Sequence, residues 1–438
     1  MRLVRKTHAA GARGSETALW EARLRVLAVL VALVLALVAL VAGTVACSAT
    51  RPVDTSITTA TSSSVIDSVA LRKGPYLMYT GDNTAMAVMW QTVATVSKAA
   101  LEWGYSSAYG NGPIDVQETS GGTDGHLFRC DIIGLKPGAL VYYRVTVGGH
   151  VYPGSFRAAP TNDAVSASLY AIGDTQDHPD VYAKVMSAML DDMGQASDAG
   201  GSILLHTGDL TGAGLAEQIW DEQFFTREYQ AVGKVLSSLP VMAALGNHES
   251  YAEQEENDDP TGNAPLLRKY WPGLFSVSPG HFYYSFDYGP VHVAVLDTWT
   301  CSFDPASDEY KWLDDDLRTS TKAWKVVMLH NPVYSADRGT EKFVSIRRYL
   351  RPLFESRGVE LVLTGHSHMY SRCEVGGVTY LTLGGGGGDL VTPSATAPYV
   401  KASAKAHHFV RLDIQGGTLT STAIGMDGKI LDSFRLNR

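Results

Sequence analysis

Cysteine is scarce in this chain of 438 residues, which contains only Cys47, Cys130, Cys301 and Cys373. Four scattered thiols exclude a disulfide framework and a CxxC zinc site. We expect one disulfide at most. Cys301 with Cys373 is the pairing to expect if one forms, and two free buried thiols are the alternative. The length alone supports a substantial core, so folding needs neither a disulfide nor a structural metal.

Positive charge is also too sparse for a protein that binds nucleic acid. The net charge is −9, but residues 1–46 carry six Arg and Lys against two Glu, which leaves −13 for the remainder. Charged residues make up 18% of the chain and hydrophobic residues 45%. This composition excludes general disorder and argues against a nucleic-acid partner.

Long apolar runs are absent except at the amino terminus, where residues 26–47 read VLAVLVALVLALVALVAGTVAC. Such a run is long enough to span the ~30 Å hydrocarbon core of a bilayer. Arg23 and Arg25 precede it, which predicts that this end stays in the cytoplasm and that the rest lies outside. The sequence TVAC also resembles a lipoprotein processing site, in which Cys47 would be lipidated. An uncleaved anchor helix and a lipid anchor stay open, and both predict an extracytoplasmic, membrane-anchored protein, or a secreted one if the segment acts only as a signal.

Four segments follow from the pattern along the chain. Residues 1–47 hold the basic terminus and the hydrophobic segment, and residues 48–70 are a Ser/Thr-rich linker. Residues 71–160 contain short alternating stretches such as LVYYRVTV at 140–147, where every second side chain shares one face, so a β-sandwich is expected. In residues 161–438, apolar runs alternate with amphipathic segments, which predicts a mostly buried α/β sheet covered on both faces.

The helical segments of this last region have clear signals. Val181, Val185 and Met189 recur at steps of four after a Pro179 start signal, and residues 341–358 form a second amphipathic stretch that Gly358 closes. Residues 281–297 and the tail from residue 407 read as antiparallel strands.

Polar residues follow each of the five apolar runs of this region. In an open α/β sheet the carboxyl ends of the strands line the ligand crevice, so these residues are expected to converge. The five motifs are GDTQ, GD, GNHE, LHNP and GHSH, and they supply Asp174, Gln176, Asp209, Asn247, His248, His330, His366 and His368.

Oxygen and nitrogen donors without a thiolate suit Mn, Fe, Zn or Ni in a reactive site rather than a structural zinc. Six or seven ligands exceed what one tetrahedral ion takes, so two ions fit better. A pair of ions needs a bridging carboxylate and serves displacement at phosphorus, by generating hydroxide and stabilising the attacking and leaving oxygens. The sequence therefore predicts a dinuclear centre that cleaves phosphate esters.

The ordered motifs resemble the calcineurin-like metallophosphoesterase superfamily. The stretches KGPYLMYT, GLKPG and YYSFDYGPVHVAVLDT make the chain similar to the purple acid phosphatase branch. The resemblance covers about residues 71–438. It implies a fibronectin-III-like sandwich for residues 71–160 and a four-layer α/β/β/α sandwich for residues 161–438.

The resemblance also implies a role for each motif residue, with two divalent or trivalent ions of iron, manganese or zinc as cofactors. His248 would not bind metal; it would be the general acid that protonates the leaving alkoxide, and Glu249 would orient His248 or its neighbour Asn247. The implied ligands are Asp174 and His368 for the first ion, Asp209 as the bridge, and Asn247, His330 and His366 for the second.

Two positions depart from the family pattern. Gly212 stands where purple acid phosphatases carry a tyrosine, which argues against a tyrosinate ligand. Gln176 stands where the wider superfamily has histidine, and its carbonyl oxygen is a weaker metal ligand than imidazole, which favours Mn, Mg or Fe(II).

Together these features predict an acid phosphatase-like enzyme that hydrolyses small phosphate monoesters, with His248 as the catalytic residue. A phosphodiesterase or nucleotidase on the same site is the alternative within the enzyme class. A non-catalytic surface protein that binds a partner is the alternative outside it.

Overall fold

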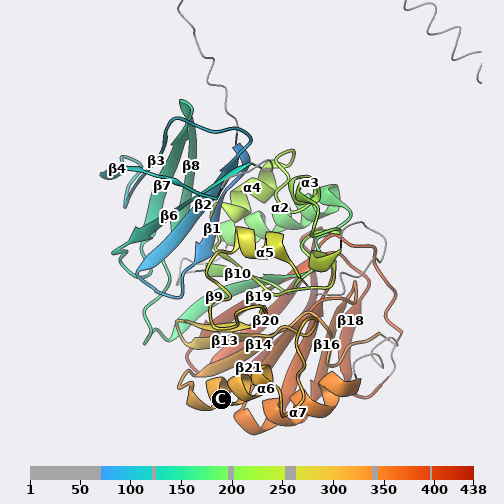
Figure 1. Cartoon of the computed structure of the whole chain (residues 1–438). Coiled ribbons are helices and arrows are strands. Elements are labelled where there is room, and N and C mark those ends of the chain that lie inside the picture. Colours follow the sequence, from blue (N-terminus) through green and yellow to red (C-terminus); the bar gives the residue numbers. More distant parts are fainter. Residues whose placement is uncertain (1–70, 121–124, 196–201, 252–262, 338–343, 395–396) are drawn as a thin grey trace, which may run out of the picture. The chain divides into compact units, whose positions relative to one another are not determined.

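The computed structural model describes residues 71–120, 125–195, 202–251, 263–337, 344–394 and 397–438 (Figure 1). The predicted membrane segment at 26–47 and the predicted linker at 48–70 lie outside the described residues, so both stay predictions. Within the described ranges, no helix has the length and apolar character needed to cross a membrane.

The first part of the described chain is a β-sandwich of two four-stranded antiparallel sheets, as the alternating pattern predicts. β7 buries Val141, Tyr143, Val145 and Val147 on one face, and these side chains pack between the sheets with Trp90 and others. In spatial order the sheets are β1 (Leu71–Tyr79), β2 (Ala85–Thr92), β6 (His126–Ile133) and β5 (Glu118–Ser120), and then β4 (Asn111–Asp115), β3 (Ala99–Gly104), β7 (Leu140–Val147) and β8 (His150–Arg157).

The second part contains two larger mixed sheets, not the single sheet that the residue pattern predicts. In spatial order the six-stranded sheet holds β11 (Val241–Ala243), β10 (Ser202–His206), β9 (Ser166–Ile172), β19 (His408–Gln415), β20 (Thr418–Gly425) and β21 (Ile430–Asn437). The seven-stranded sheet holds β12 (Tyr284–Tyr288), β13 (Val291–Val295), β14 (Trp324–Met328), β15 (Leu361–Thr364), β17 (Val378–Leu383), β16 (Tyr370–Val375) and β18 (Val400–Ala404).

Helices cover the outer faces of the two sheets (Figure 1). The six-stranded sheet carries α2 (Pro179–Gln195), α3 (Glu217–Glu222) and α4 (Gln230–Leu236), whereas the seven-stranded sheet carries α6 (Asp308–Thr319) and α7 (Val344–Arg357). A short helix α5 (Pro265–Tyr270) and a 3-10 turn η2 (His248–Ser250) complete the set within these ranges. The order helix, sheet, sheet, helix is the four-layer α/β/β/α sandwich that the resemblance implies.

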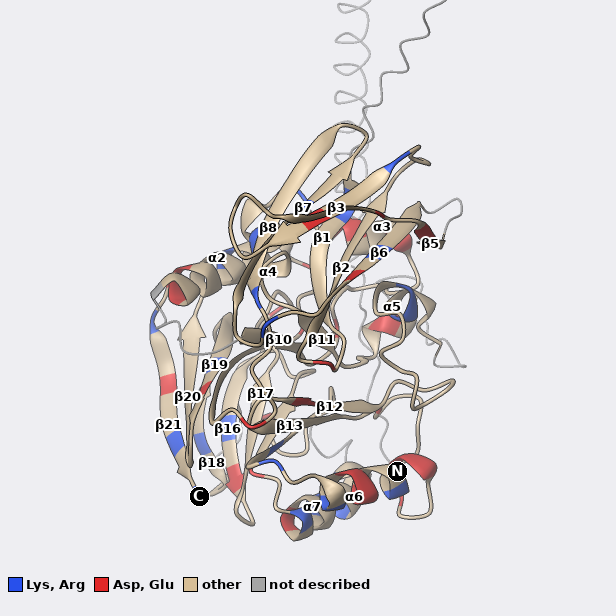
Figure 2. Ribbon diagram, turned by 90° about the vertical axis from the view of Figure 1, so that its left-hand side faces the viewer, with Lys and Arg blue, Asp and Glu red and all other residues tan. Residues whose placement is uncertain are grey.

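Burial explains why these segments adopt this arrangement. Figure 2 shows charged residues on α6, α7 and the outer strands, while β10, β11 and β17 carry none and are almost wholly buried. On α2, Val185 and Met189 face the core as predicted, but Tyr182 and Met186 complete the buried face and Val181 is half-buried. α7 ends at Arg357, and Gly358 follows with φ +69°, a left-handed conformation that glycine adopts without strain.

The sandwich packs on the helices that follow it in the chain. Tyr76 on β1 donates a hydrogen bond to the Tyr270 carbonyl at 2.9 Å, and Lys73, which is fully buried, pairs with Glu217 at 2.8 Å. The three cysteines in the described ranges, Cys130, Cys301 and Cys373, are all free thiols, so Cys301 and Cys373 are not bridged. Of the two, only Cys373 is buried; Cys301 is half-buried.

Candidate metal centre

The polar residues after the five apolar strands meet where the carboxyl ends of the two sheets adjoin. β9, β10 and β11 run parallel in the six-stranded sheet and end before Asp174, Asp209 and Asn247. β14 and β15 run parallel in the seven-stranded sheet and end before His330 and His366. The predicted convergence is therefore present, but three motifs come from one sheet and two from the other.

One group of side chains surrounds Asp209. Its Oδ2 lies 3.1 Å from His330 Nε2, and ligand atoms of Asp209, His330 and His366 all lie within 4.8 Å of one another. Asn247 Oδ1 lies 3.1 Å from His330 Nε2 and 3.1 Å from His366 Nδ1. These four residues are the predicted bridge and the predicted ligands of the second ion.

A second group adjoins the first through Asp174. His368 Nε2 lies 3.5 Å from Asp174 Oδ1 and 3.2 Å from Gln176 Nε2. His366 belongs to the first group, and its backbone N–H donates a hydrogen bond to Asp174 Oδ1 at 2.7 Å, which links the two groups. All seven predicted ligands thus lie in two adjoining groups, although metal binding by each of them stays a prediction.

The donor set fits two metal ions. Asp174 Oδ2 and Gln176 Oε1 are buried and have no hydrogen-bond partner within the part of the chain that the structure describes, and such acceptors are costly unless something binds them. Burial opposes ionisation of Asp209, but the imidazoles of His330 and His248 outweigh it and lower the pKa of this carboxyl. Buried carboxylate and imidazole donors without a thiolate are the ligands that a reactive, non-structural site offers.

The same carboxylates act on the histidines. Burial lowers the pKa of His330, but the charge of Asp209 and its hydrogen bond outweigh burial and raise the pKa to about 10. At His366, burial together with the charge of His330 lowers the pKa to about 4. The buried carboxylates therefore stabilise positive charge on the groups next to them.

His248 lies beside the two groups, and its backbone and its ring make different contacts. Its backbone N–H donates to Asp209 Oδ1 at 2.9 Å, while its ring Nδ1 donates to the Gly212 carbonyl at 2.9 Å. The ring of Tyr251 packs against it with centroids 4.8 Å apart. With Nδ1–H donating to Gly212, the other ring nitrogen of His248 is Nε2, and the hydrogen bond at Nδ1 sets the tautomer of the ring.

Backbone groups hold the histidines in place, and sequence reasoning missed them. His330 Nδ1 donates to the Thr207 carbonyl and His368 Nδ1 to the Asp389 carbonyl, both at 2.9 Å. Contacts of this kind fix the tautomer and the ring orientation of a metal-binding histidine. A carbonyl carries no side-chain signal, so no motif identifies these two partners.

Glu249 has a different role from the one predicted. Its carboxylate accepts hydrogen bonds from the backbone N–H groups of Asp209 at 3.0 Å, Leu210 at 2.7 Å and Gly246 at 2.7 Å. It therefore fixes the turn that carries Asp209, and it does not orient the side chain of His248 or Asn247. Burial and the charge of Asp209 raise the pKa of Glu249 to about 7.

The glycine run 384–388 approaches the centre closely. The N–H groups of Gly387 and Gly388 donate to the Asp174 carbonyl at 2.7 and 3.0 Å. A Cβ on Gly388 would lie 2.5 Å from the His368 ring, so no other residue fits without a shift. The run is therefore part of the wall beside the centre.

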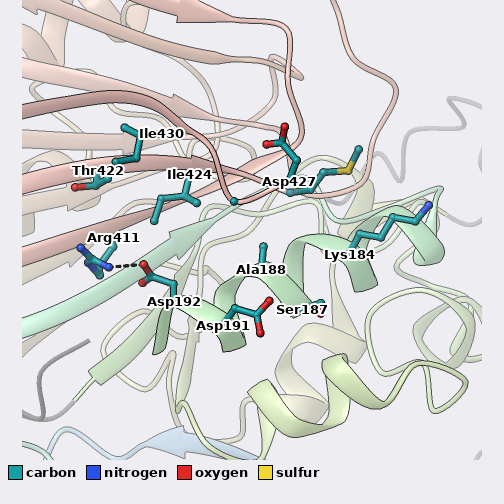
Figure 3. A pocket seen from close by; sticks show the side chains of 12 residues that line it. Lys184, Ser187, Ala188, Asp191, Asp192, Arg411, Thr422, Ile424, Asp427 and Ile430 are labelled. Atoms are coloured by element: carbon teal, nitrogen blue, oxygen red, sulfur yellow. Dashed lines mark hydrogen bonds and ion pairs between the residues drawn. The ribbon is translucent and has the colours of Figure 1, made fainter. Parts of the chain in front are cut away.

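A separate pocket of about 480 Å³ lies between α2 and the strands β19–β21 (Figure 3). Arg411 and Asp192 form an ion pair in its lining, and Lys184 and Asp427 line it as well. None of the predicted site residues lines this pocket, so it is distinct from the candidate metal centre.

Comparisons with known families agree with the two parts of the fold. Residues 167–370 match the family described as calcineurin-like phosphoesterase. Residues 73–160 match the family described as purple acid phosphatase, N-terminal domain.

The chain is also similar to curated purple acid phosphatases. Purple acid phosphatase 21 of Arabidopsis thaliana is 29% identical over 275 residues, which cover 60% of this chain and 59% of that protein. Purple acid phosphatase 22 of the same plant is 30% identical over 278 residues, which also cover 60% of this chain and 59% of that protein. The chain thus spans about 59% of the length of these relatives.

The fold is also similar to that of solved structures. Purple acid phosphatase PPD1 from yellow lupin (Lupinus luteus) seeds has a TM-score of 0.69 at 17% identity, over 84% of this chain and 75% of that one. The structure of PhoD has a TM-score of 0.60 at 14% identity, over 87% and 92%. The two family matches show that the chain carries a calcineurin-like phosphoesterase domain behind a purple acid phosphatase N-terminal domain, as its motifs imply, and the solved structures agree with them in fold.

Proposed function

We propose that this chain is a metal-dependent phosphatase that hydrolyses small phosphate monoesters. The observation that supports the proposal most is the meeting of Asp209, Asn247, His330 and His366 at 3.1 Å contacts, with Asp174 and His368 alongside. Calcineurin-like phosphoesterases use a dinuclear metal centre, and the donor set described above fits one. Which metals bind is left to experiment.

In this proposal, each of the two groups of side chains would hold one ion, and Asp209 would serve both ions. When bound, two such ions activate a water molecule for attack on phosphorus and stabilise the charge of the phosphoryl oxygens. Asp174, Gln176 and His368 would hold the first ion, and Asn247, His330 and His366 the second. The unpaired acceptors Asp174 Oδ2 and Gln176 Oε1 favour ligation by both residues of the GDTQ motif.

His248 would act on the leaving group. Its Nδ1–H is held by the Gly212 carbonyl, which leaves the Nε2 proton for the departing alkoxide oxygen. Gly212, at the position where the family carries a tyrosine, would contribute this carbonyl and no metal ligand. Tyr251 packs against the ring and would keep it from rotating away.

The amino-terminal sequence is the part of the chain that indicates where the protein is located. We propose that residues 26–47 tether the protein outside the cytoplasm, as a helix or through lipidated Cys47, with residues 48–70 as spacer. Alkaline carbonate extraction of membranes from cells that express the full chain tests this. Cys47→Ala distinguishes the two anchors, because it abolishes only the lipid one. Recovery of the unmodified chain in the soluble fraction would contradict both.

Metal removal tests the proposed activity directly. The purified chain should hydrolyse an aryl phosphate, lose that activity on dialysis against a chelator, and regain it on addition of Mn²⁺, Fe²⁺ or Zn²⁺. Parallel assays with a diester and a nucleotide separate the monoesterase from the two related activities. Turnover that survives complete metal removal, shown by elemental analysis, would reject the mechanism.

A further inference from the structure

A second set of metal-ligating side chains lies outside the candidate metal centre. Ligand atoms of His281, Asp297 and Cys301 all lie within 4.8 Å of one another. Asp297 follows β13, which neighbours the strand β14 that leads to His330, but none of the three belongs to the proposed dinuclear site. Asp297 is fully buried, Cys301 is half-buried and His281 is exposed.

Glu309 in the first turn of α6 adds a fourth side chain to this cluster. It is only 3% exposed, and its Oε1 accepts a hydrogen bond from the Asp297 backbone N–H at 2.7 Å. Its Oε2 is buried and has no hydrogen-bond partner in the described ranges of the chain. The Cys301 thiol contacts the Asp297 carboxylate, and the charges of Asp297 and Glu309 both act on it.

Two buried carboxylates this close together need compensating charge. Among the described residues, neither Asp297 nor Glu309 forms an ion pair with lysine or arginine. The nearby Arg268 donates instead to the His281 carbonyl. Burial and the charge of Asp297 raise the pKa of Glu309 well above its usual value. A proton on Glu309 or a bound cation would each relieve the repulsion.

The backbone holds Asp297 in position for a ligand. Its Oδ1 accepts from the N–H groups of Trp299 at 3.1 Å and Thr300 at 2.8 Å, and its Oδ2 accepts from the Phe282 N–H at 3.1 Å. The Cys301 Sγ lies 3.7 Å from Oδ2. Two ligands on one tetrahedral zinc ion lie about 3.5 Å apart, given bonds of about 2.0–2.3 Å.

We propose that His281, Asp297, Cys301 and Glu309 form a mononuclear site for a thiophilic divalent cation of the Zn²⁺ type. One imidazole, one thiolate and two carboxylates make a four-coordinate donor set for such an ion. The exposed His281 has the freedom to close the remaining distance. On binding, the Cys301 thiol releases its proton to solvent and the sulfur bonds the metal.

The site would fix the loop that borders the candidate metal centre. Residues 297–301 carry Trp299, whose ring contacts that of Tyr251 with centroids 6.5 Å apart, and Tyr251 packs on His248. Burial and both carboxylates raise the pKa of the Cys301 thiol, so it stays protonated at neutral pH unless a cation binds. The proposal stands independently of the phosphatase activity.

Titration of the metal-depleted full chain with Co²⁺ tests the proposal, because only a thiolate ligand gives the near-ultraviolet sulfur-to-cobalt charge-transfer band. The proposed dinuclear centre has no cysteine, so Co²⁺ bound there does not contribute. We expect the band to saturate at one Co²⁺ per chain. It should disappear in Cys301→Ser and persist in Cys130→Ser and Cys373→Ser, which are the matched controls.

Two further variants keep the test decisive if Cys301→Ser folds poorly. His281→Ala at the exposed position should weaken the cobalt affinity that the band reports by at least about tenfold, in line with the loss of a ligand. Glu309→Gln should weaken it similarly while retaining the bond to the Asp297 N–H. The proposal would be overturned if the wild-type chain shows no band or if the band survives in Cys301→Ser. It would also be overturned if His281→Ala and Glu309→Gln both leave the Co²⁺ affinity unchanged.

Discussion

His248 is the residue whose substitution separates a general acid from a metal ligand. We expect His248→Ala to lower kcat by about 10²–10⁴, which is the usual contribution of a positioned acid. This factor corresponds to about 3–5 kcal/mol of transition-state stabilisation. Since the hydrogen bond from His248 to Asp209 is made by the backbone N–H, which the substitution keeps, the metal content should stay that of the wild type.

The leaving group supplies the more specific readout. An acidic phenol departs as phenolate with little help, whereas an alcohol must be protonated as it leaves. The loss in His248→Ala should therefore be near the upper end for an alkyl phosphate and much smaller for an aryl phosphate with an acidic phenol. His248→Asn should behave in the same way, because its amide is able to keep the hydrogen bond to Gly212 but has no proton to give.

The assay compares kcat and kcat/KM for the two substrates, with elemental analysis of each preparation. His126→Ala on β6 of the sandwich is the matched control, since this histidine contacts Glu118 on a neighbouring strand and lies in the other domain. An equal loss on both substrates would refute the general-acid role. A loss of metal would instead make His248 a ligand.

Three further predictions concern groups around the centre and in the core. Two carboxylates that contact the His292 ring at 2.7 and 2.8 Å outweigh its burial and raise its pKa from 6.5 to about 9. A histidine whose pKa is raised by folding stabilises the folded state at pH values below its pKa in the unfolded state. This contribution is lost as the pH rises through its pKa in the folded state. The difference in unfolding free energy between wild type and His292→Gln should therefore shrink by about 3 kcal/mol between pH ~6 and ~10 in urea titrations, and a constant difference would contradict this. Gly388→Ala should displace the His368 ring and lower both metal content and kcat at least about tenfold, whereas Gly233→Ala on α4, where a Cβ meets nothing within 4 Å, should leave both unchanged. Glu249→Gln replaces one accepting oxygen with a donor, so at least one buried N–H loses its partner; thermal unfolding should show a loss of about 1–3 kcal/mol, and unchanged stability would argue against the backbone role.

The elements of the fold were predictable from the sequence, but their division into two sheets was not. Alternation identified β7, and apolar runs identified the five strands that end at the centre, because burial imposes these patterns locally. Pairing is different: β19, at residues 408–415, lies beside β9, at residues 166–172. Periodicity records that a strand is buried and does not record its neighbour. Only the resemblance to a family implied the second sheet.

In the candidate centre, the side chains were predictable from the sequence and the backbone contacts were not. The motif side chains were identifiable because carboxylates and imidazoles after apolar strands are unusual in type and position. The carbonyls of Thr207 and Asp389 that orient two histidines were not, since every residue has a carbonyl. Glu249 was assigned to the wrong partner for a related reason: three backbone N–H groups surround its carboxylate, and no sequence pattern reports a backbone donor.

The glycine in each GD or GH pair explains why such common dipeptides mark this centre. Asp174, Asp209 and His366 adopt φ values of 57°, 55° and 65°, a left-handed region that costs a non-glycine residue about 1–3 kcal/mol. The preceding glycine makes the turn possible, because a Cβ there would lie within 3 Å of a residue on another strand end. This holds for Gly173, Gly208 and Gly365. Strand ends packed this closely hold their side chains at hydrogen-bond distance before any ion binds. The strain is thus the cost of a preorganised site, and it is offset by the hydrogen bonds that Glu249 accepts and by those that the glycine run 384–388 donates.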